Sequence, residues 1–211
     1  MDNSVINIES QSHILSIFCD GGDSIYNPRT QSDNINHFVT KGYKTGEDES
    51  HTNDILRKVA KALGFNTYDK SNLEIVIALS QSKNKKIEKY IIIKELYVYD
   101  HGGVSFSMSP FSCPWDSGQA GFIVSTRYDY ENVGLKFEKE KVIDQMERDV
   151  ELWDKYCRNE IYGFTIEDKD GEVLESVGGF IDYLDDVLEE VKKSYLHDYP
   201  DLIEACKKNS S

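Results

Sequence analysis

Residues 90–109, YIIIKELYVYDHGGVSFSMS, hold the clearest structural pattern in the chain. The β-branched and aromatic residues from Tyr90 to Tyr99 are typical of a long strand. Gly102 and Gly103 favour a tight turn, and apolar and polar residues then alternate over 104–109, as in a second strand. The stretch therefore predicts an antiparallel hairpin.

Other segments with the same character lie on both sides of this hairpin. Strands are predicted at residues 14–18, 37–43, 73–79, 120–126, 160–167 and 172–178. The run LEIVIAL at 73–79 is rich in β-branched residues, which indicates a central buried strand. Asp168 to Gly171 is a turn sequence in which glycine suits a left-handed conformation, so the last two strands are expected to form a hairpin.

Three helices are predicted, near residues 53–63, 138–158 and 182–195. The first should have Thr52 or Asn53 as its N-cap and end at Gly64. The second shows one apolar stripe at helical spacing, made of Val142, Met146, Val150, Trp153 and Cys157. Together these elements predict an α+β fold with a largely antiparallel sheet, about three helices and a single domain over residues 1–211.

Composition limits the kind of partner. The 211 residues carry a formal charge of −14, so direct binding to nucleic acid or to an anionic membrane is not expected. The opening residues have no basic and apolar run of a signal peptide, and no apolar run is long enough to span a bilayer, so we expect a cytoplasmic protein of the host cell. The four cysteines are widely scattered, which favours neither disulfides nor a zinc ribbon. No cofactor or metal is predicted.

The negative charge is concentrated in the second part of the chain. Residues 129–211 hold 23 acidic and 11 basic residues. Within the long predicted helix, one face carries Glu140, Asp144, Glu147, Glu151 and Asp154, set away from the apolar stripe. Such a row is either a solvated helix face or a docking surface for a basic partner. We take these five carboxylates as the candidate partner-binding residues.

The segment from residue 100 to 119 collects most of the reactive side chains. The candidate site residues there are Asp100, His101, Cys113, Trp115, Asp116, Ser117 and Gln119. A Cys–His nucleophile or an Asp/His metal site is one interpretation. The other is a structured loop in which Phe111 and Trp115 are buried and Asp116 caps backbone N–H groups. Ligand binding by the loop is a third.

The pattern YDHGG…SPFSCPWDSGQAGFI resembles the signature of an uncharacterised family encoded by phages and plasmids of Gram-positive bacteria. That family has a YDHSG strand end followed by SPFSC, WDSGQ and a GFI strand. Similar upstream residues are Asp20, Pro28-Arg29, Asp33-Asn34, His37 and Tyr43-Lys44-Thr45-Gly46. Gly103 departs from the family pattern, which has serine there. The resemblance implies a gene of a mobile element, many of whose small acidic products inhibit host defence.

The sequence thus favours binding over catalysis. The leading hypothesis is an accessory protein that inhibits a host defence system, anti-CRISPR or antirestriction, by presenting acidic surface to the basic nucleic-acid-binding surface of a defence protein. The alternatives are a metal- or Cys-dependent hydrolase and an accessory protein that binds a small ligand. The sequence predicts no particular oligomeric state.

Overall fold

The computed structural model describes residues 4–21, 24–30 and 34–209. Two compact units are present. Unit 1 combines the N-terminal segment up to Tyr26 with the C-terminal segment from Lys155, and unit 2 is the chain between them, from Asn27 to Asp154. The expectation of one domain stays a prediction. The two units are defined by the contacts within each of them, whereas a domain is defined by its ability to fold independently.

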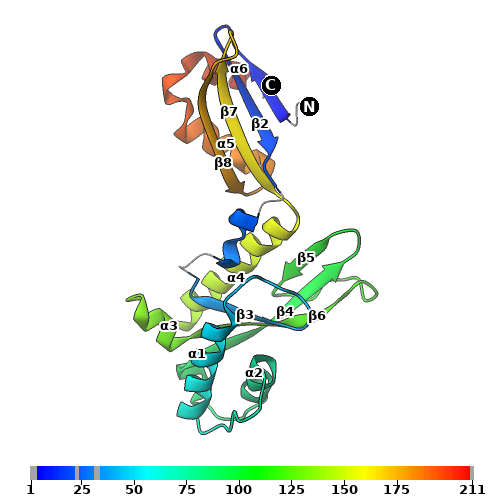
Figure 1. Ribbon diagram of the computed structural model, residues 1–211, viewed down its shortest axis with the longest axis vertical. Coiled ribbons are helices and arrows are strands. Elements are labelled where there is room, and N and C mark those ends of the chain that lie inside the picture. Colours follow the sequence, from blue (N-terminus) through cyan, green and yellow to red (C-terminus); the bar gives the residue numbers. More distant parts are fainter. Residues whose placement is uncertain (1–3, 22–23, 31–33, 210–211) are drawn as a thin grey trace. The chain divides into compact units, whose positions relative to one another are not determined.

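Unit 1 is a four-stranded antiparallel sheet with helices on one face (Figure 1). Its strands, in the order β1-β2-β7-β8, are β1 Ser4–Glu9, β2 His13–Cys19, β7 Ile161–Asp168 and β8 Val173–Ile181. The helical elements are η1 Ser24–Tyr26, α5 Leu184–Ser194, η4 Leu196–Asp198 and α6 Pro200–Asn209. Leu15 and Ile17 of β2 pack with Phe164 of β7 and Val191 of α5 in a fully buried cluster.

The hairpin predicted around Gly171 is confirmed. β7 and β8 pair antiparallel, and Gly171 has a φ of 85°, a left-handed conformation that costs glycine no steric strain. β1 and α6 were not predicted from the sequence. β1 alternates exposed and less exposed residues at the edge of the sheet, and only Ile8 is buried. An edge strand of this kind has a weak hydrophobic signal.

Unit 2 contains the second antiparallel sheet, in the order β3-β6-β4-β5. The strands are β3 Asn36–Thr40, β4 Ile91–Asp100, β5 Val104–Ser107 and β6 Ser117–Thr126. The helical elements are η2 Pro28–Thr30, α1 Glu49–Ala62, α2 Asn72–Ser80, η3 Ile87–Lys89, α3 Arg127–Asn132 and α4 Lys139–Cys157. The last three residues of α4 belong to unit 1.

Helices cover both faces of the second sheet (Figure 1). Val39 of β3 and Phe122 of β6 pack with α1 and α2 in one buried cluster. Phe38, the neighbour of Val39, points to the opposite face, where its ring meets Trp153 of α4 edge-on at 6.3 Å. The α4 stripe is confirmed over four of its five positions, because Val142, Met146, Val150 and Trp153 are buried whereas Cys157 is half-buried.

The strand predicted at residues 73–79 is wrong, because this segment forms α2. Ser71 is the N-cap, and it forms a reciprocal capping box with Glu74. A capping box satisfies two backbone donors at a helix start, which outweighs the weak strand preference of the β-branched residues. The predicted N-cap of the preceding helix is also wrong, because the N-cap of α1 is Asp48, four residues before Thr52. The predicted end of this helix is confirmed, because Gly64 follows its last turn with a φ of 81°.

The fold class predicted from the sequence, α+β with antiparallel strands, is confirmed, but the described residues form six α-helices rather than about three. The added helices are α2, the short α3 and the C-terminal α6. None of the helices in the described ranges is both long enough and apolar enough to cross a bilayer.

Candidate functional site

The acidic face of α4 is largely solvent-exposed. Glu140, Asp144, Glu147 and Glu151 are exposed, whereas Asp154 is half-buried. The Asp154 carboxylate accepts a hydrogen bond from the backbone N–H of Phe106 at 2.7 Å. Because β5 is an edge strand, this contact satisfies a donor that would otherwise lack a partner in the sheet. Asp154 therefore has a structural role, and the other four carboxylates of the predicted row are exposed at the surface.

A shallow hollow joins this face to the end of β5. Its volume is about 300 Å³, and it is lined on the helix side by Glu147, Val150, Glu151 and Asp154 and on the other side by residues 106–109. The acidic face of α4 and the start of the β5–β6 loop therefore form one continuous surface of unit 2.

The β5–β6 loop is held in place by its own polar groups and by the end of β4. The backbone N–H of Asp100 donates to the carbonyl oxygen of Asp116 at 2.8 Å, and the Ser117 hydroxyl donates to the carbonyl oxygen of Cys113. Phe111 packs beside Tyr99 with 5.8 Å between ring centroids. These contacts support the structured-loop interpretation of this segment.

Trp115 was predicted to be buried, and this is wrong. Its exposed fraction is 90%, and Phe111 is only half-buried. The neighbouring Pro110 and Pro114 restrict the loop backbone, so the indole is presented to solvent from an ordered segment. The predicted capping role of Asp116 also changes, because its carboxylate contacts two side chains instead.

Those two side chains are His101 and Cys113. The Asp116 carboxylate lies 3.4 Å from His101 Nδ1, and the Cys113 thiol donates to it at 3.6 Å. A Cys–His nucleophile needs the imidazole against the sulfur, whereas here a carboxylate stands between them. This geometry does not support the Cys-dependent hydrolase.

The outer members of the predicted loop site do not converge on His101. Gln119 is exposed, and its amide nitrogen donates to the carbonyl oxygen of Gly121 at 3.4 Å. Asp100 is exposed as well and lies near Tyr43, where partial burial together with the Asp100 charge raises the pKa of the Tyr43 hydroxyl. Of the seven residues predicted for this site, the structure therefore brings His101, Cys113 and Asp116 together.

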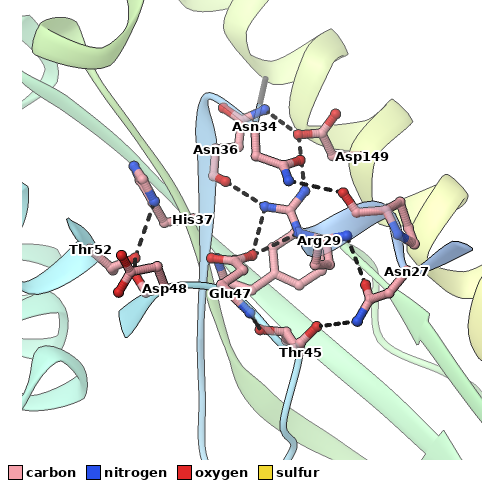
Figure 2. Close-up of polar contacts among 12 residues, drawn as sticks. Asn27, Arg29, Asn34, Asn36, His37, Thr45, Glu47, Asp48, Thr52 and Asp149 are labelled. Carbon is pink, nitrogen blue, oxygen red and sulfur yellow. Dashed lines mark hydrogen bonds and ion pairs between the residues drawn. The ribbon is translucent and has the colours of Figure 1, made fainter. Parts of the chain in front are cut away.

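A second polar centre, which sequence reasoning did not identify as a site, surrounds Arg29 (Figure 2). The Arg29 side chain is 2% exposed and pairs with Glu47 at 2.6 Å. It also donates to the carbonyl oxygen of Asn36 at 2.5 Å, approaches Asp149 of α4 at 3.5 Å, and stacks over the Phe38 ring. Burial raises the pKa of the Glu47 carboxyl, while the Arg29 guanidinium acts in the opposite direction.

This centre contains several residues of the pattern that the sequence was expected to share with the phage and plasmid family. Arg29, Asn34, His37 and Thr45 all lie in it, and the Asn27 amide donates to the carbonyl oxygen of Thr45 at 2.9 Å (Figure 2). Asp33 lies outside the described residues. A polar pattern clustered before the first predicted helix was the available signal for this centre.

Next to it, His37 belongs to a cluster with His51 and Asp129, also missed from the sequence. His37 Nε2 lies 3.1 Å from one Asp129 carboxylate oxygen, and His51 Nε2 lies 3.5 Å from the other. Burial of Asp129 raises its pKa, but hydrogen bonds and charge from His37, with help from Thr126, outweigh this and lower the pKa overall. Nothing in the spacing of residues 37, 51 and 129 could have indicated this cluster, because it forms only when β3, α1 and α3 meet.

No protein-family model, curated protein or solved structure matches this chain.

Proposed function

We propose that this chain is a mobile-element accessory protein that acts by binding, and that it inhibits a host defence enzyme by docking on that enzyme's basic nucleic-acid-binding surface. The docking surface consists of Trp115 together with the exposed carboxylates Glu140, Asp144, Glu147 and Glu151. The observation that carries this proposal is the 90% exposure of Trp115 on an internally bonded loop.

An exposed tryptophan leaves a large apolar area in water. Burial of an aromatic side chain of this size removes roughly 150–250 Å² from solvent, worth several kcal/mol at about 25 cal/mol per Å². Tryptophan is also among the residues that most often dominate the binding energy of protein interfaces. Because the loop is already ordered, little conformational entropy is lost when the indole enters a partner's pocket.

The acidic face supplies the complementary electrostatic contribution. Glu140, Asp144 and Glu147 make no ion pair with any of the described residues, so their charges are available to a partner. Rows of like charge raise association rates with an oppositely charged surface and fix its orientation. The hollow of about 300 Å³ connects this row with Met108 and Ser109 at the start of the loop that carries Trp115.

The nature of the partner is inferred from charge and from the resemblance to phage and plasmid proteins. A net charge of −14 disfavours nucleic acid itself and favours a protein that normally binds it.

The test compares two groups of variants that keep the fold. Trp115→Ala removes the aromatic anchor, and the triple variant Glu140→Lys/Asp144→Lys/Glu147→Lys reverses the acidic face. A matched control reverses three exposed carboxylates of unit 1, Glu172→Lys/Asp186→Lys/Glu204→Lys, with the same change in net charge. Each protein is expressed in a host and assayed for protection of a phage or plasmid from restriction and from CRISPR interference.

We expect Trp115→Ala and the α4 triple variant to lose protection while the unit 1 triple variant keeps it. A captured partner should also dissociate as salt is raised, since charge contacts at a surface are screened. If only His101→Ala, Cys113→Ala or Asp116→Ala abolishes protection, the loop acts through chemistry or ligand binding and the docking proposal is rejected.

A further inference from the structure

His37, His51 and Asp129 come from three different elements of unit 2 and meet at one point. His37 lies on β3, His51 in the first turns of α1, and Asp129 on α3. Each residue offers one ligand atom, and these atoms lie within 4.8 Å of one another. Two imidazoles and a carboxylate form the donor set of many zinc and other first-row metal sites.

We propose that this cluster is a binding site for one divalent transition-metal ion, with Zn²⁺ the expected occupant. The ligands are Nε2 of His37, Nε2 of His51 and the Asp129 carboxylate. This inference concerns a face of unit 2 that the proposed docking surface does not include, and it does not depend on that proposal.

The spacing of the ligand atoms fits a tetrahedral ion. Zinc bonds to histidine nitrogen and carboxylate oxygen are about 2.0–2.2 Å long, which places ligand atoms roughly 3.3 Å apart along each edge of the tetrahedron. His37 Nε2 lies 3.1 Å from Asp129 Oδ2 and His51 Nε2 lies 3.5 Å from Asp129 Oδ1, so each imidazole is within about this distance of one oxygen of the carboxylate. One ligand atom from each of the three residues can be chosen so that all lie within 4.8 Å of one another, and a small side-chain shift would bring them to the tetrahedral spacing. The His37 and His51 rings, with centroids 5.4 Å apart, are also close enough to share an ion.

Hydrogen bonds behind the cluster fix the orientation of the ligands. The Thr52 hydroxyl donates to the carbonyl oxygen of Asp48 at 3.4 Å, so its oxygen is free to accept from Nδ1–H of His37, 3.2 Å away. In the tautomer with Nδ1 protonated, His37 presents the Nε2 lone pair to Asp129. A lone pair beside a carboxylate is repulsive unless a proton or a cation lies between them. Hydroxyl or carbonyl partners of this kind are typical of metal-binding histidines.

The Asp129 carboxylate has its own support. The Thr126 hydroxyl, at the N-cap of α3, donates to one carboxylate oxygen at 2.5 Å. Asp129 is buried, so its position is set by packing as well as by this bond. A buried carboxylate that faces two imidazoles therefore has a fixed geometry before any ion arrives.

One coordination position would remain open to water or a ligand. His51 is 58% exposed on its side chain, and His37 and His51 face a hollow of about 470 Å³ that Asp48 and Thr52 also line. Nitrogen donors disfavour Mg²⁺ and Ca²⁺, which prefer oxygen ligands, so the site should discriminate between these classes of ion.

The variant His51→Ala gives the sharpest test, because His51 is exposed and its removal should leave the metal-free fold intact. Protein treated with a chelator is titrated with Zn²⁺ by calorimetry, and with Co²⁺ while the visible spectrum of the bound ion is recorded. We expect one equivalent of Zn²⁺ to bind, a four-coordinate Co²⁺ spectrum and a rise in Tm with Zn²⁺ but not with Mg²⁺. Thr52→Val, which removes only the supporting hydroxyl, should weaken binding by about 10–100-fold.

Two controls keep the test specific. His101→Ala removes an exposed histidine that lies beside Cys113 and Asp116, and it should leave zinc affinity unchanged if the cluster is the site. Asp129→Asn should weaken zinc binding as strongly as His51→Ala. The proposal is overturned if the wild-type protein binds no Zn²⁺, in which case the cluster is a buried His–Asp ion pair, or if His51→Ala binds Zn²⁺ as tightly as the wild type does.

Discussion

Removal of the Arg29 guanidinium should strongly destabilise unit 2, and the size of the effect can be worked from its contacts. In Arg29→Met the Glu47 carboxylate, 8% exposed, loses two charged donors at 2.6 and 2.7 Å, and the donor it keeps among the described residues is the backbone N–H of Phe38. Loss of one partner from a buried ion pair costs about 3–5 kcal/mol, because the other charge stays buried without compensation. We therefore expect Arg29→Met to lower the free energy of unfolding by about 4 kcal/mol.

The double variant Arg29→Met/Glu47→Gln separates this cause from simple loss of packing. Replacement of both charges leaves no uncompensated carboxylate at position 47, so the double variant should be more stable than Arg29→Met alone by about 2 kcal/mol. The two tryptophans, Trp115 and Trp153, both lie in unit 2, so urea unfolding followed by tryptophan fluorescence reports on this unit. Trp153 should give most of the signal, since its ring is buried.

The same variant predicts a pH dependence whose sign follows from Glu47. Burial raises the pKa of this carboxyl, and Arg29 opposes that effect, so loss of Arg29 raises the pKa further. A raised folded-state pKa destabilises the protein above that pKa, and the penalty disappears as the carboxyl becomes protonated. The cost of Arg29→Met should therefore shrink as the pH falls from neutral towards the ordinary glutamate pKa of about 4. This account would be refuted if Arg29→Met lowered the free energy of unfolding by the same amount at every pH, and by the same amount whether residue 47 is Glu or Gln.

Three further predictions concern other parts of the chain. Trp115→Ala should change the free energy of unfolding by no more than about 0.5 kcal/mol in urea denaturation, as for other surface changes, whereas a cost of about 3–5 kcal/mol would show that the indole is part of the core. Ser71→Ala should destabilise unit 2 by about 1 kcal/mol through loss of the α2 capping box, and Ser80→Ala at the other end of that helix should cost less. Partial burial raises the pKa of Asp201, but hydrogen bonds from Ser10 and His13 outweigh it and lower the pKa to about 2. At neutral pH, Asp201→Asn should therefore lower the free energy of unfolding, measured by thermal unfolding, by at most about 2 kcal/mol. This loss should vanish as the pH falls from about 4 to about 2, and a difference between variant and wild type that persists at pH 2 would contradict this role.

The strands of both sheets were largely predictable because their signal is local. The run at 90–100 and the alternation at 104–109 correspond to β4 and β5, and residues 160–178 correspond to the β7–β8 hairpin. Alternation and β-branched content depend only on neighbours in sequence. The two hairpin pairings, β4 with β5 and β7 with β8, were therefore predictable as well. The other pairings could not be predicted, since the distribution of the strands over two sheets depends on contacts between distant segments.

The errors come from competing local signals and from long-range contacts. At 73–79 the apolar run is compatible with either a strand or a buried helix, and Ser71 with Glu74 at capping-box spacing was the deciding feature. The exposure of Trp115 could not be predicted from its neighbours, because an aromatic residue that follows a proline can be buried in a core or exposed to a partner. The His37–His51–Asp129 cluster depends on three separate elements and has no sequence signature.

The residues of the expected family pattern differ in how much they contribute to the stability of the fold. Arg29 and His37 are buried in polar contacts, so their presence is explained by stability or by a metal site within unit 2. Trp115 makes no comparable contribution, because an indole that is 90% exposed buries little apolar area within its own chain. Under the proposed function, a side chain that the fold does not need, held in place by an internally bonded loop, would have its energetic effect when a partner covers it. For that reason the change Trp115→Ala should separate function from stability more cleanly than any substitution at Arg29 or His37.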